Sequence, residues 1–196
     1  MTDFLSAAYW ENRYQNQTTG WNIGEASTPL VDFINTIQDK NAAILIPGCG
    51  NAYEADYLLQ NGFTNVTVID IALTPVAIMK EKFAKQPIKI FQQDFFNHEG
   101  QYDFILEQTF FCALNPLLRL AYVQKMKQLL KPNGLLAGLL FNKIFENNPP
   151  FGGSKEEYEL LFFPHLHIQK MELCTNSIKA REGTELFFTV KNLSLA

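Results

Sequence analysis

Residues Ile44-Leu-Ile-Pro-Gly-Cys-Gly-Asn-Ala-Tyr-Glu54 decide the fold, because an apolar strand leads directly into a turn bracketed by two glycines and then into a helix. Gly48 and Gly50 have no Cβ, so the backbone can turn sharply and a ligand can approach it closely. The helix that follows directs its unpaired N–H groups toward the same space. A Gly-x-Gly turn after a strand is also compatible with a tight connection that binds nothing.

A second signal lies twenty residues after Gly50, where the apolar run Val66-Thr-Val-Ile ends in Asp70. In a doubly wound α/β sheet, an acidic residue at the end of the second strand lies beside the glycine turn, where it accepts hydrogen bonds from a ribose diol. The alternative role of Asp70 is to cap the helix that begins near Pro75. Together, the turn and Asp70 predict a site for a nucleoside cofactor.

Composition places the 196-residue chain among packed globular proteins, with 47% hydrophobic and 18% charged residues. The net charge of −4, with no concentration of Lys and Arg, argues against a nucleic-acid partner. No apolar run is long enough to span a bilayer and no signal-peptide core is present, so we expect a cytoplasmic protein with no membrane partner. Three cysteines without a Cys-x-x-Cys pair predict neither a disulfide framework nor a metal site.

Short apolar runs alternate with longer amphipathic segments, which is typical of a parallel sheet with helices on both faces. We expect strands near residues 43–46, 66–70, 88–91, 104–107, 135–140, 165–174 and 185–191. Helices are expected over about 52–61, from about 74, and over 116–130, the last ending at a Lys-Pro-Asn-Gly turn. No helical pattern separates the last two strands, which predicts an antiparallel pair.

The N-terminal forty residues do not follow this alternation. Two amphipathic helical stretches, about 3–15 and 28–38, flank a glycine-containing loop with Trp21. We therefore predict a single domain over residues 1–196, in which an N-terminal helical cover (1–40) acts as a lid on an α/β core (41–196).

The residue types around the turn narrow the cofactor. Dinucleotide dehydrogenases place a third glycine where this chain has Tyr53, and Tyr53 with Glu54 suits an amino-acid tail better than a pyrophosphate. Asp94 and Phe95 follow the third strand, where a carboxylate can accept from an adenine amino group and a ring can cover the base. A turn aspartate and a core phenylalanine are the alternative roles. The combination points to S-adenosylmethionine.

The run Thr109-Phe-Phe-Cys-Ala-Leu114, together with Tyr9-Trp-Glu-Asn-Arg-Tyr14, Gly20-Trp21 and Pro149-Pro-Phe151, resembles the thiopurine methyltransferase family. The resemblance covers nearly the whole chain and is closest to the halide and thiol methyltransferase branch. It implies a class I methyltransferase fold, a Rossmann-like, doubly wound sheet of seven strands whose last strand is antiparallel. It also implies S-adenosyl-L-methionine as cofactor and S-adenosyl-L-homocysteine as product.

The resemblance further implies which residues bind the cofactor. Residues matching Trp10, Tyr14 and Trp21 line the sulfonium end, where a cation on aromatic faces gains about 0.5–2 kcal/mol. Core packing of an N-terminal helix is the alternative role of these rings. The remaining predicted cofactor-binding residues are Gly48, Gly50, Asp70, Asp94, Phe95 and Gln108.

The pair Glu107-Gln108 departs from the family, whose branches have Asp-Arg or Asp-Tyr there. Gln108 supplies neither a cation nor a phenol, which leaves the acceptor class open. Methyl transfer from a sulfonium needs alignment more than a base, and a thiol is partly ionised at neutral pH. Glu107 is the candidate catalytic base for an oxygen or nitrogen acceptor. Contact with the cofactor or capping of a turn is its alternative role.

Aromatic and basic residues are candidates for acceptor binding. Phe110, Phe111 and Phe151 form a predicted apolar wall suited to soft or aromatic acceptors. Arg181, and also Arg119, can attract an anionic acceptor, although a solvated surface position is the commoner role of arginine. His165 and His167 alternate on a predicted strand without a third ligand, so we interpret them as structural.

The sequence therefore predicts a methyltransferase that moves a methyl group to a small soft nucleophile, namely a thiol, a thiopurine-like compound or a halide, by in-line displacement. Two alternatives remain open: a class I enzyme acting on an oxygen or nitrogen of a small molecule, and a protein that binds S-adenosylmethionine without turnover. We expect a monomer or a weak homodimer.

Overall fold

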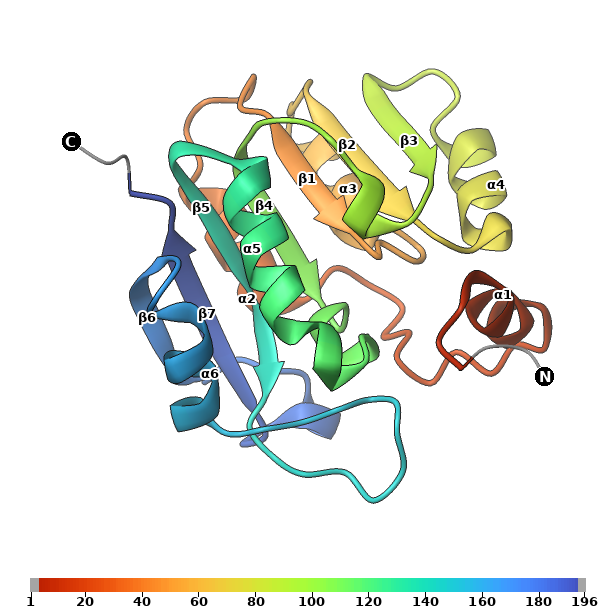
Figure 1. The fold of residues 1–196 in the computed structure, drawn as a ribbon. Helices are drawn as coiled ribbons and strands as arrows, with labels where there is room; N and C mark the ends of the chain where they lie inside the picture. The colour runs from red at the N-terminus through yellow and green to blue at the C-terminus, as the bar shows by residue number, and fades with distance from the viewer. Residues whose placement is uncertain (1–3, 194–196) are drawn as a thin grey trace.

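The computed structural model describes residues 4–193 of the chain and contains a seven-stranded sheet with the strand order β3-β2-β1-β4-β5-β7-β6 (Figure 1). β7 runs antiparallel to both of its neighbours, and the other paired strands are parallel. The strands are β1 (Ile44–Pro47), β2 (Val66–Asp70), β3 (Ile88–Gln92), β4 (Tyr102–Gln108), β5 (Leu130–Phe141), β6 (His167–Leu173) and β7 (Glu185–Lys191). The predicted doubly wound sheet with an antiparallel last strand is confirmed.

The strand order reverses beside β1. The chain builds β1, β2 and β3 in one direction, and then crosses back to place β4 on the other side of β1. At such a reversal the connections leave in opposite directions, which opens a crevice at the carboxyl ends of the strands. The predicted glycine turn after β1 lies at this crevice.

Helices cover both faces of the sheet (Figure 1). Residues of α2 (Thr28–Thr36), α3 (Tyr53–Gln60) and α4 (Leu73–Lys82) share one buried apolar cluster, and residues of α5 (Arg119–Leu129) and α6 (Lys155–Phe162) share the other. Successive side chains of β1 point to opposite faces of the sheet and so contribute to both clusters. Ile44 and Ile46 belong to the first cluster, and Leu45 belongs to the second. A strand buried on both faces reads as the continuous apolar run seen in the sequence.

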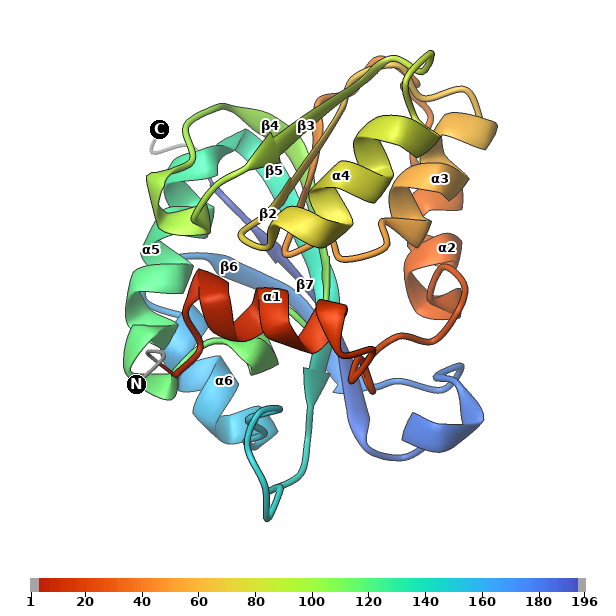
Figure 2. The ribbon, with the colours of Figure 1, turned by 90° about the vertical axis from the view of Figure 1, so that its right-hand side faces the viewer.

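The N-terminal helix α1 (Ala7–Gln15) lies beside the start of α4 (Figure 2). It begins after Ser6, whose hydroxyl accepts a hydrogen bond from the Tyr9 N–H, so it is shorter than the predicted stretch 3–15; residue 3 itself lies outside the described residues. The Glu11 carboxylate accepts from the Thr74 N–H at 2.8 Å and from its hydroxyl at 2.5 Å. Glu11 thus supplies, from another helix, an N-terminal cap for α4.

Several element boundaries differ from the prediction, two of them notably. β6 begins at His167 rather than at residue 165. The segment Lys131–Gly134, predicted as a turn before a strand, lies within β5. Asn192 explains this, because its backbone carbonyl accepts from the Asn133 N–H at 2.6 Å and its side-chain amide donates to the Leu130 carbonyl at 2.9 Å. The pairing register between β4 and β5 shifts at the same place.

The division of the chain into a cover (1–40) and a core (41–196) within one domain stays a prediction. Within residues 4–193, no helix has the length and hydropathy needed to cross a membrane.

Arg119, in the first turn of α5, is 7% exposed. Its guanidinium donates to Glu157 Oε1 at 2.6 Å and to the Gly152 carbonyl at 2.8 Å, and its Cζ lies 4.9 Å from the centre of the Phe111 ring. These contacts join α5 to the segment that leads into α6.

We predict that Arg119→Met lowers the free energy of unfolding by about 1–3 kcal/mol, because the partly buried Gly152 carbonyl and the Glu157 carboxylate lose a charged donor. Urea denaturation measures the change. The matched control is Lys82→Met, which removes a partly exposed ion pair with Asp56 and should change stability by less than about 1 kcal/mol. Equal losses in the two variants would contradict the structural role of Arg119.

Candidate cofactor and acceptor site

Two cavities adjoin at the carboxyl ends of β1, β2 and β4. The larger has a volume of about 550 Å³, which suits a cofactor with a small acceptor. The smaller has a volume of about 50 Å³, enough for several groups the size of a water molecule. Trp21, Gly48 and Thr109 line both cavities, so the two cavities are direct neighbours on either side of these residues.

The glycine turn needs its glycines for two reasons. Gly48 and Gly50 have φ angles of 56° and 51°, in the left-handed region that side chains rarely adopt. A Cβ on Gly48 would overlap the Phe110 ring, and a Cβ on Gly50 would lie 2.9 Å from the Tyr14 hydroxyl. The turn is therefore packed directly against two aromatic side chains of the site.

Asp70, at the end of β2, is 7% exposed and lines the larger cavity. Its Oδ2 accepts from the Gly50 N–H and its Oδ1 from the Ala72 N–H, both at 2.9 Å. Burial raises the pKa of Asp70, while these two backbone donors act in the opposite direction. Each oxygen retains a second lone pair, so the carboxylate can both hold the turn and accept from a ribose diol.

Three aromatic rings of the cover, Trp10, Tyr14 and Trp21, line the larger cavity; we call them the aromatic cluster. Trp21 meets the other two edge to face, with centroid distances of 5.4 Å to Trp10 and 5.7 Å to Tyr14. Burial, with a contribution from Asp70, raises the pKa of the Tyr14 phenol, which therefore stays protonated. The cluster offers ring faces that a sulfonium cation can approach.

Asp94 and Phe95 lie after β3 and also line this cavity. The Asp94 Oδ1 accepts from the Phe96 N–H at 2.9 Å, and its other oxygen makes no hydrogen bond to another described residue. The Phe95 ring is buried and packs edge to face on Phe110 at 5.1 Å. The alternative roles of a turn aspartate and a core phenylalanine are thus present, and both residues still face the cavity.

Residues at or after the ends of β4 and β5 line another part of the larger cavity, which we call the acceptor end: Phe110, Cys112, Phe141, Phe145 and Pro149. In the sheet, β4 and β5 lie on one side of β1, whereas β3, which Asp94 follows, lies on the other side. Among the described residues, Asp70 and Asp94 are the carboxylates that line this cavity, and no histidine lines it. The acceptor end is therefore mainly apolar.

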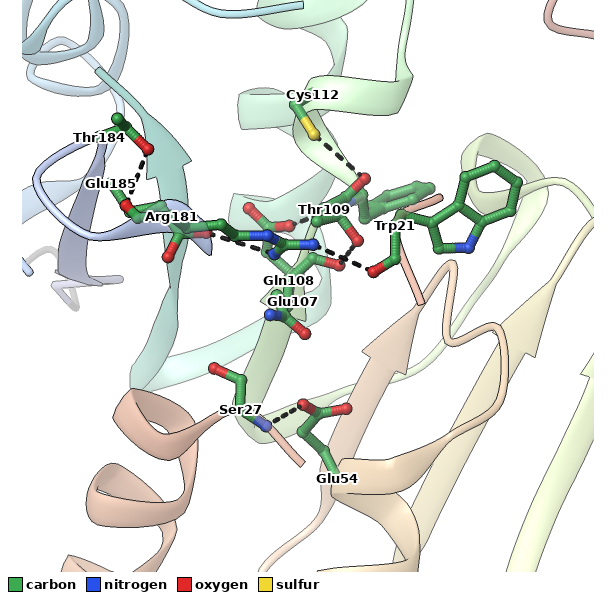
Figure 3. Close-up of polar contacts among 11 residues, drawn as sticks. Trp21, Ser27, Glu54, Glu107, Gln108, Thr109, Cys112, Arg181, Thr184 and Glu185 are labelled. Carbon is green, nitrogen blue, oxygen red and sulfur yellow. Dashed lines mark hydrogen bonds and ion pairs between the residues drawn. The ribbon is translucent and has the colours of Figure 1, made fainter. Parts of the chain in front are cut away.

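Arg181, in the short 3-10 turn η4 (Lys179–Arg181), is 8% exposed and reaches the larger cavity. Its guanidinium donates to Glu185 Oε1 at 3.3 Å and to the Trp21 carbonyl at 3.0 Å (Figure 3). Glu185 compensates its charge, and the contact with Trp21 holds the cover. Gln108 lies nearby and lines the smaller cavity.

The sequence profile of the family described as Thiopurine S-methyltransferase (TPMT) matches residues 5–190. The chain belongs to this family. It is similar to the probable thiol methyltransferase 2 of Arabidopsis thaliana, with 31% identity over 92% of this chain and 83% of that protein. It is also similar to the thiopurine S-methyltransferase of Vibrio vulnificus, with 24% identity over 84% of each chain.

Solved structures share the fold of this methyltransferase. The 1,6-didemethyltoxoflavin-N1-methyltransferase of Burkholderia thailandensis, solved with S-adenosylhomocysteine, has a TM-score of 0.79 and 16% identity over 96% of this chain and 87% of that chain. The fold is the class I methyltransferase fold. The chain is an S-adenosyl-L-methionine-dependent methyltransferase (EC 2.1.1.-), with S-adenosyl-L-homocysteine as product.

The structure places Glu107, the candidate catalytic base, away from both cavities. Glu107 is 0% exposed and lines neither cavity. Its Oε2 accepts from the N–H groups of Phe110 and Phe111 at 3.2 and 3.3 Å. This geometry matches the turn-capping alternative: Glu107 fixes the turn after β4 and so positions Phe110.

Of the predicted apolar wall, Phe110 lines the larger cavity and Phe111 does not. Phe111 is 1% exposed and packs between Tyr122, at 5.0 Å, and Tyr158, at 5.6 Å, in the core beneath the site. Phe151 is half-buried and does not line the cavity; its N–H donates to the Cys112 carbonyl at 2.7 Å. The preceding Pro149 and Pro150 lie at the wall instead.

Several residues of the site were not predicted from the sequence, including Thr109, Cys112, Phe141, Lys143 and Phe145. Phe141 ends β5, and a position at the carboxyl end of a parallel strand is a signal that marks it. The long connection after β5, which contains Lys143 and Phe145, is the second signal, because long loops in compact domains often serve binding. Thr109 has a φ of 60°, which no sequence pattern indicated.

We predict that Asp70→Ala weakens the binding of S-adenosylhomocysteine at least about tenfold, because the ribose loses a charged acceptor and the glycine turn loses its anchor. Isothermal titration calorimetry measures the affinity. Asp70→Asn keeps one oxygen acceptor and should give an intermediate loss. Unchanged affinity in Asp70→Ala would refute the assignment of this residue.

Burial raises the pKa of the Glu107 carboxyl group to about 7. A raised carboxyl pKa means that folding favours the protonated form, so stability is complete below the unfolded pKa of about 4.3 and falls as the pH rises through about 7. Glu107→Gln is neutral at every pH. Between about pH 5 and 8, the wild type should lose about 1–3 kcal/mol of unfolding free energy relative to this variant in urea denaturation. If the unfolding free energies of the wild type and Glu107→Gln changed in parallel with pH, the prediction would be wrong.

Proposed function

We propose that this methyltransferase transfers a methyl group to a small soft nucleophile, namely a thiol, a thiopurine-like compound or a halide, by in-line displacement. The observation that supports it is the chemistry of the acceptor end, where no described carboxylate or histidine is placed to remove a proton. An oxygen or nitrogen nucleophile with a high pKa usually needs such a base. A thiolate or halide does not.

The cofactor supplies a methyl group that is already activated on a sulfonium. We propose that Asp70 binds the ribose, that Asp94 and Phe95 hold the adenine, and that the aromatic cluster encloses the sulfonium. Gly48 and Gly50 let the cofactor approach the backbone, and Gln108 faces its amino-acid tail. With the cofactor fixed in this way, the contribution of the protein is to align the nucleophile behind the methyl group and to exclude water.

The wall at the acceptor end suits this acceptor class. Phe110, Phe141 and Phe145 provide apolar surface for a soft or aromatic group. Lys143 lies 4.7 Å from the centre of the Phe145 ring and makes no ion pair with a described residue, and Arg181 adds a second, compensated cation. A thiol near pKa 8.5 that is drawn to this wall as a thiolate needs no further activation.

Cys112 lines the same end and does not compete with the acceptor. Burial, with a contribution from Glu107, raises the pKa of the Cys112 thiol. The neutral thiol is a much weaker nucleophile than a thiolate. We therefore propose that the residue forms part of the wall.

A similar protein supports the same class: the chain is 27% identical, over 90% of its length, to the thiocyanate methyltransferase 1 of Brassica oleracea. An oxygen or nitrogen acceptor is the second candidate, and Gln108, where the family has a cation or a phenol, leaves room for a different specificity. Binding of the cofactor without turnover is the third candidate function.

For the assembly, a monomer or a weak homodimer stays our prediction.

We predict that the pH dependence of methyl transfer follows the acceptor rather than the enzyme. With a simple thiol, kcat/KM should rise about tenfold per pH unit below the thiol pKa of about 8.5, while transfer to iodide should stay nearly constant between pH 6.5 and 8.5, in roughly the range where the thiol titrates. Product formation with a panel of thiols, thiopurines, iodide and phenols measures this. Faster methylation of phenols than of thiols would favour the second candidate, and cofactor binding without any product the third.

A further inference from the structure

The smaller cavity contains a buried carboxylate that no role described so far accounts for. Glu54 is 7% exposed and is the one charged side chain among the described residues that line this cavity. Its Oε1 accepts from the Ser27 N–H at 3.0 Å. Its Oε2 makes no hydrogen bond to another described residue. Figure 3 shows the carboxylate pointing from the start of α3 toward the side of the site where Gln108 lies.

The surroundings of Glu54 leave its charge uncompensated. Burial raises its pKa, with the Ser27 N–H and the more distant Arg181 acting in the opposite direction. No described lysine or arginine comes within ion-pair distance of it, and Arg181 is already paired with Glu185. A buried carboxylate with a free oxygen is unfavourable unless a donor or a cation meets it. The cavity therefore favours a positively charged group next to Oε2.

The position of the cavity indicates which group that is. Trp21, Gly48 and Thr109 separate it from the larger cavity, and Trp21 belongs to the aromatic cluster. A cofactor held by Asp70 and with its sulfonium at this cluster extends its remaining substituent past Trp21. That substituent is an amino acid with an ammonium and a carboxylate group. Neutral amide side chains that can donate to the carboxylate line the same cavity, at Asn22, Asn51 and Gln108.

We propose that Glu54 binds the α-ammonium group of the S-adenosylmethionine tail in the smaller cavity. The volume of about 50 Å³ matches a small charged head group rather than a ring. The proposal rests on the cofactor site and is independent of the acceptor class, so it can fail while the proposed acceptor chemistry stands, and the reverse also holds.

A purely structural role for Glu54 is the competing explanation, since Oε1 also tethers the chain before α2 through Ser27. The variant Glu54→Gln separates the two roles. Its side-chain carbonyl can still accept from the Ser27 N–H, but the variant has no negative charge. The matched control is Asp56→Asn, which also replaces a carboxylate by its amide, two residues further along α3. The Asp56 carboxylate pairs with Lys82 outside both cavities.

The experiment compares two ligands by isothermal titration calorimetry: S-adenosylhomocysteine and an analogue that lacks only its α-amino group. Wild type and Asp56→Asn should prefer S-adenosylhomocysteine by about 10- to 100-fold, the range expected for a charge-assisted contact. In Glu54→Gln this preference should fall to less than about threefold, because the affinity for S-adenosylhomocysteine drops while that for the analogue is unchanged.

Three results would overturn the proposal. Glu54→Gln can retain the wild-type preference between the two ligands, or it can weaken both ligands by the same factor, as a purely structural role requires. The wild type can also fail to distinguish the ligands at all. Far-ultraviolet circular dichroism and a thermal melt of each variant establish that the compared proteins are folded.

Discussion

The carboxylate of Asp70 is the constraint on which the site depends. One oxygen accepts from the glycine turn that follows β1, and the other accepts from the start of α4 that follows β2. The two connections are thereby fixed to each other at the point where the strand order reverses. A side chain that holds the backbone in this way keeps a free lone pair on each oxygen, so the same buried charge can serve both structure and the ribose contact that we propose.

The cover is attached through polar contacts that belong to the site. Glu11 caps α4 through Thr74, Glu54 accepts from the Ser27 N–H, and Arg181 donates to the Trp21 carbonyl. Each contact joins the first thirty residues to a different element of the core. Because Trp21 also lines both cavities, the position of these N-terminal residues and the shape of the cavities are set together.

The sequence predicts most of the sheet and the side of it that carries the site, because apolar runs, glycines and the acidic end of a strand are local features. It does not indicate where the side chains of Glu107 and Phe111 lie, because the direction of each side chain depends on the backbone after β4. Thr109 lies in the left-handed region there, so the chain turns and places Phe110 in the cavity and Phe111 in the core. Composition alone does not distinguish two adjacent phenylalanines. The same limit applies to Glu54: the sequence associates it with a cofactor that has an amino-acid tail, but does not indicate which group its carboxylate contacts.

Charge balance explains why the buried acids divide into different roles. Arg181 pairs with Glu185 and also acts, from a greater distance, on Glu54; its ion pair with Glu185 uses its charge. Glu107 has no cation, and burial together with Glu185 raises its pKa, so near neutral pH it is partly protonated and acts through two backbone N–H groups. Glu54 also lacks a cation, but unlike Glu107 it faces a cavity. A neutral form suffices for a carboxyl group sealed in the core, whereas one with a free oxygen in a cavity is stabilised by a cationic ligand. The position of each acid relative to the cavities, rather than its residue type, decides which role it takes.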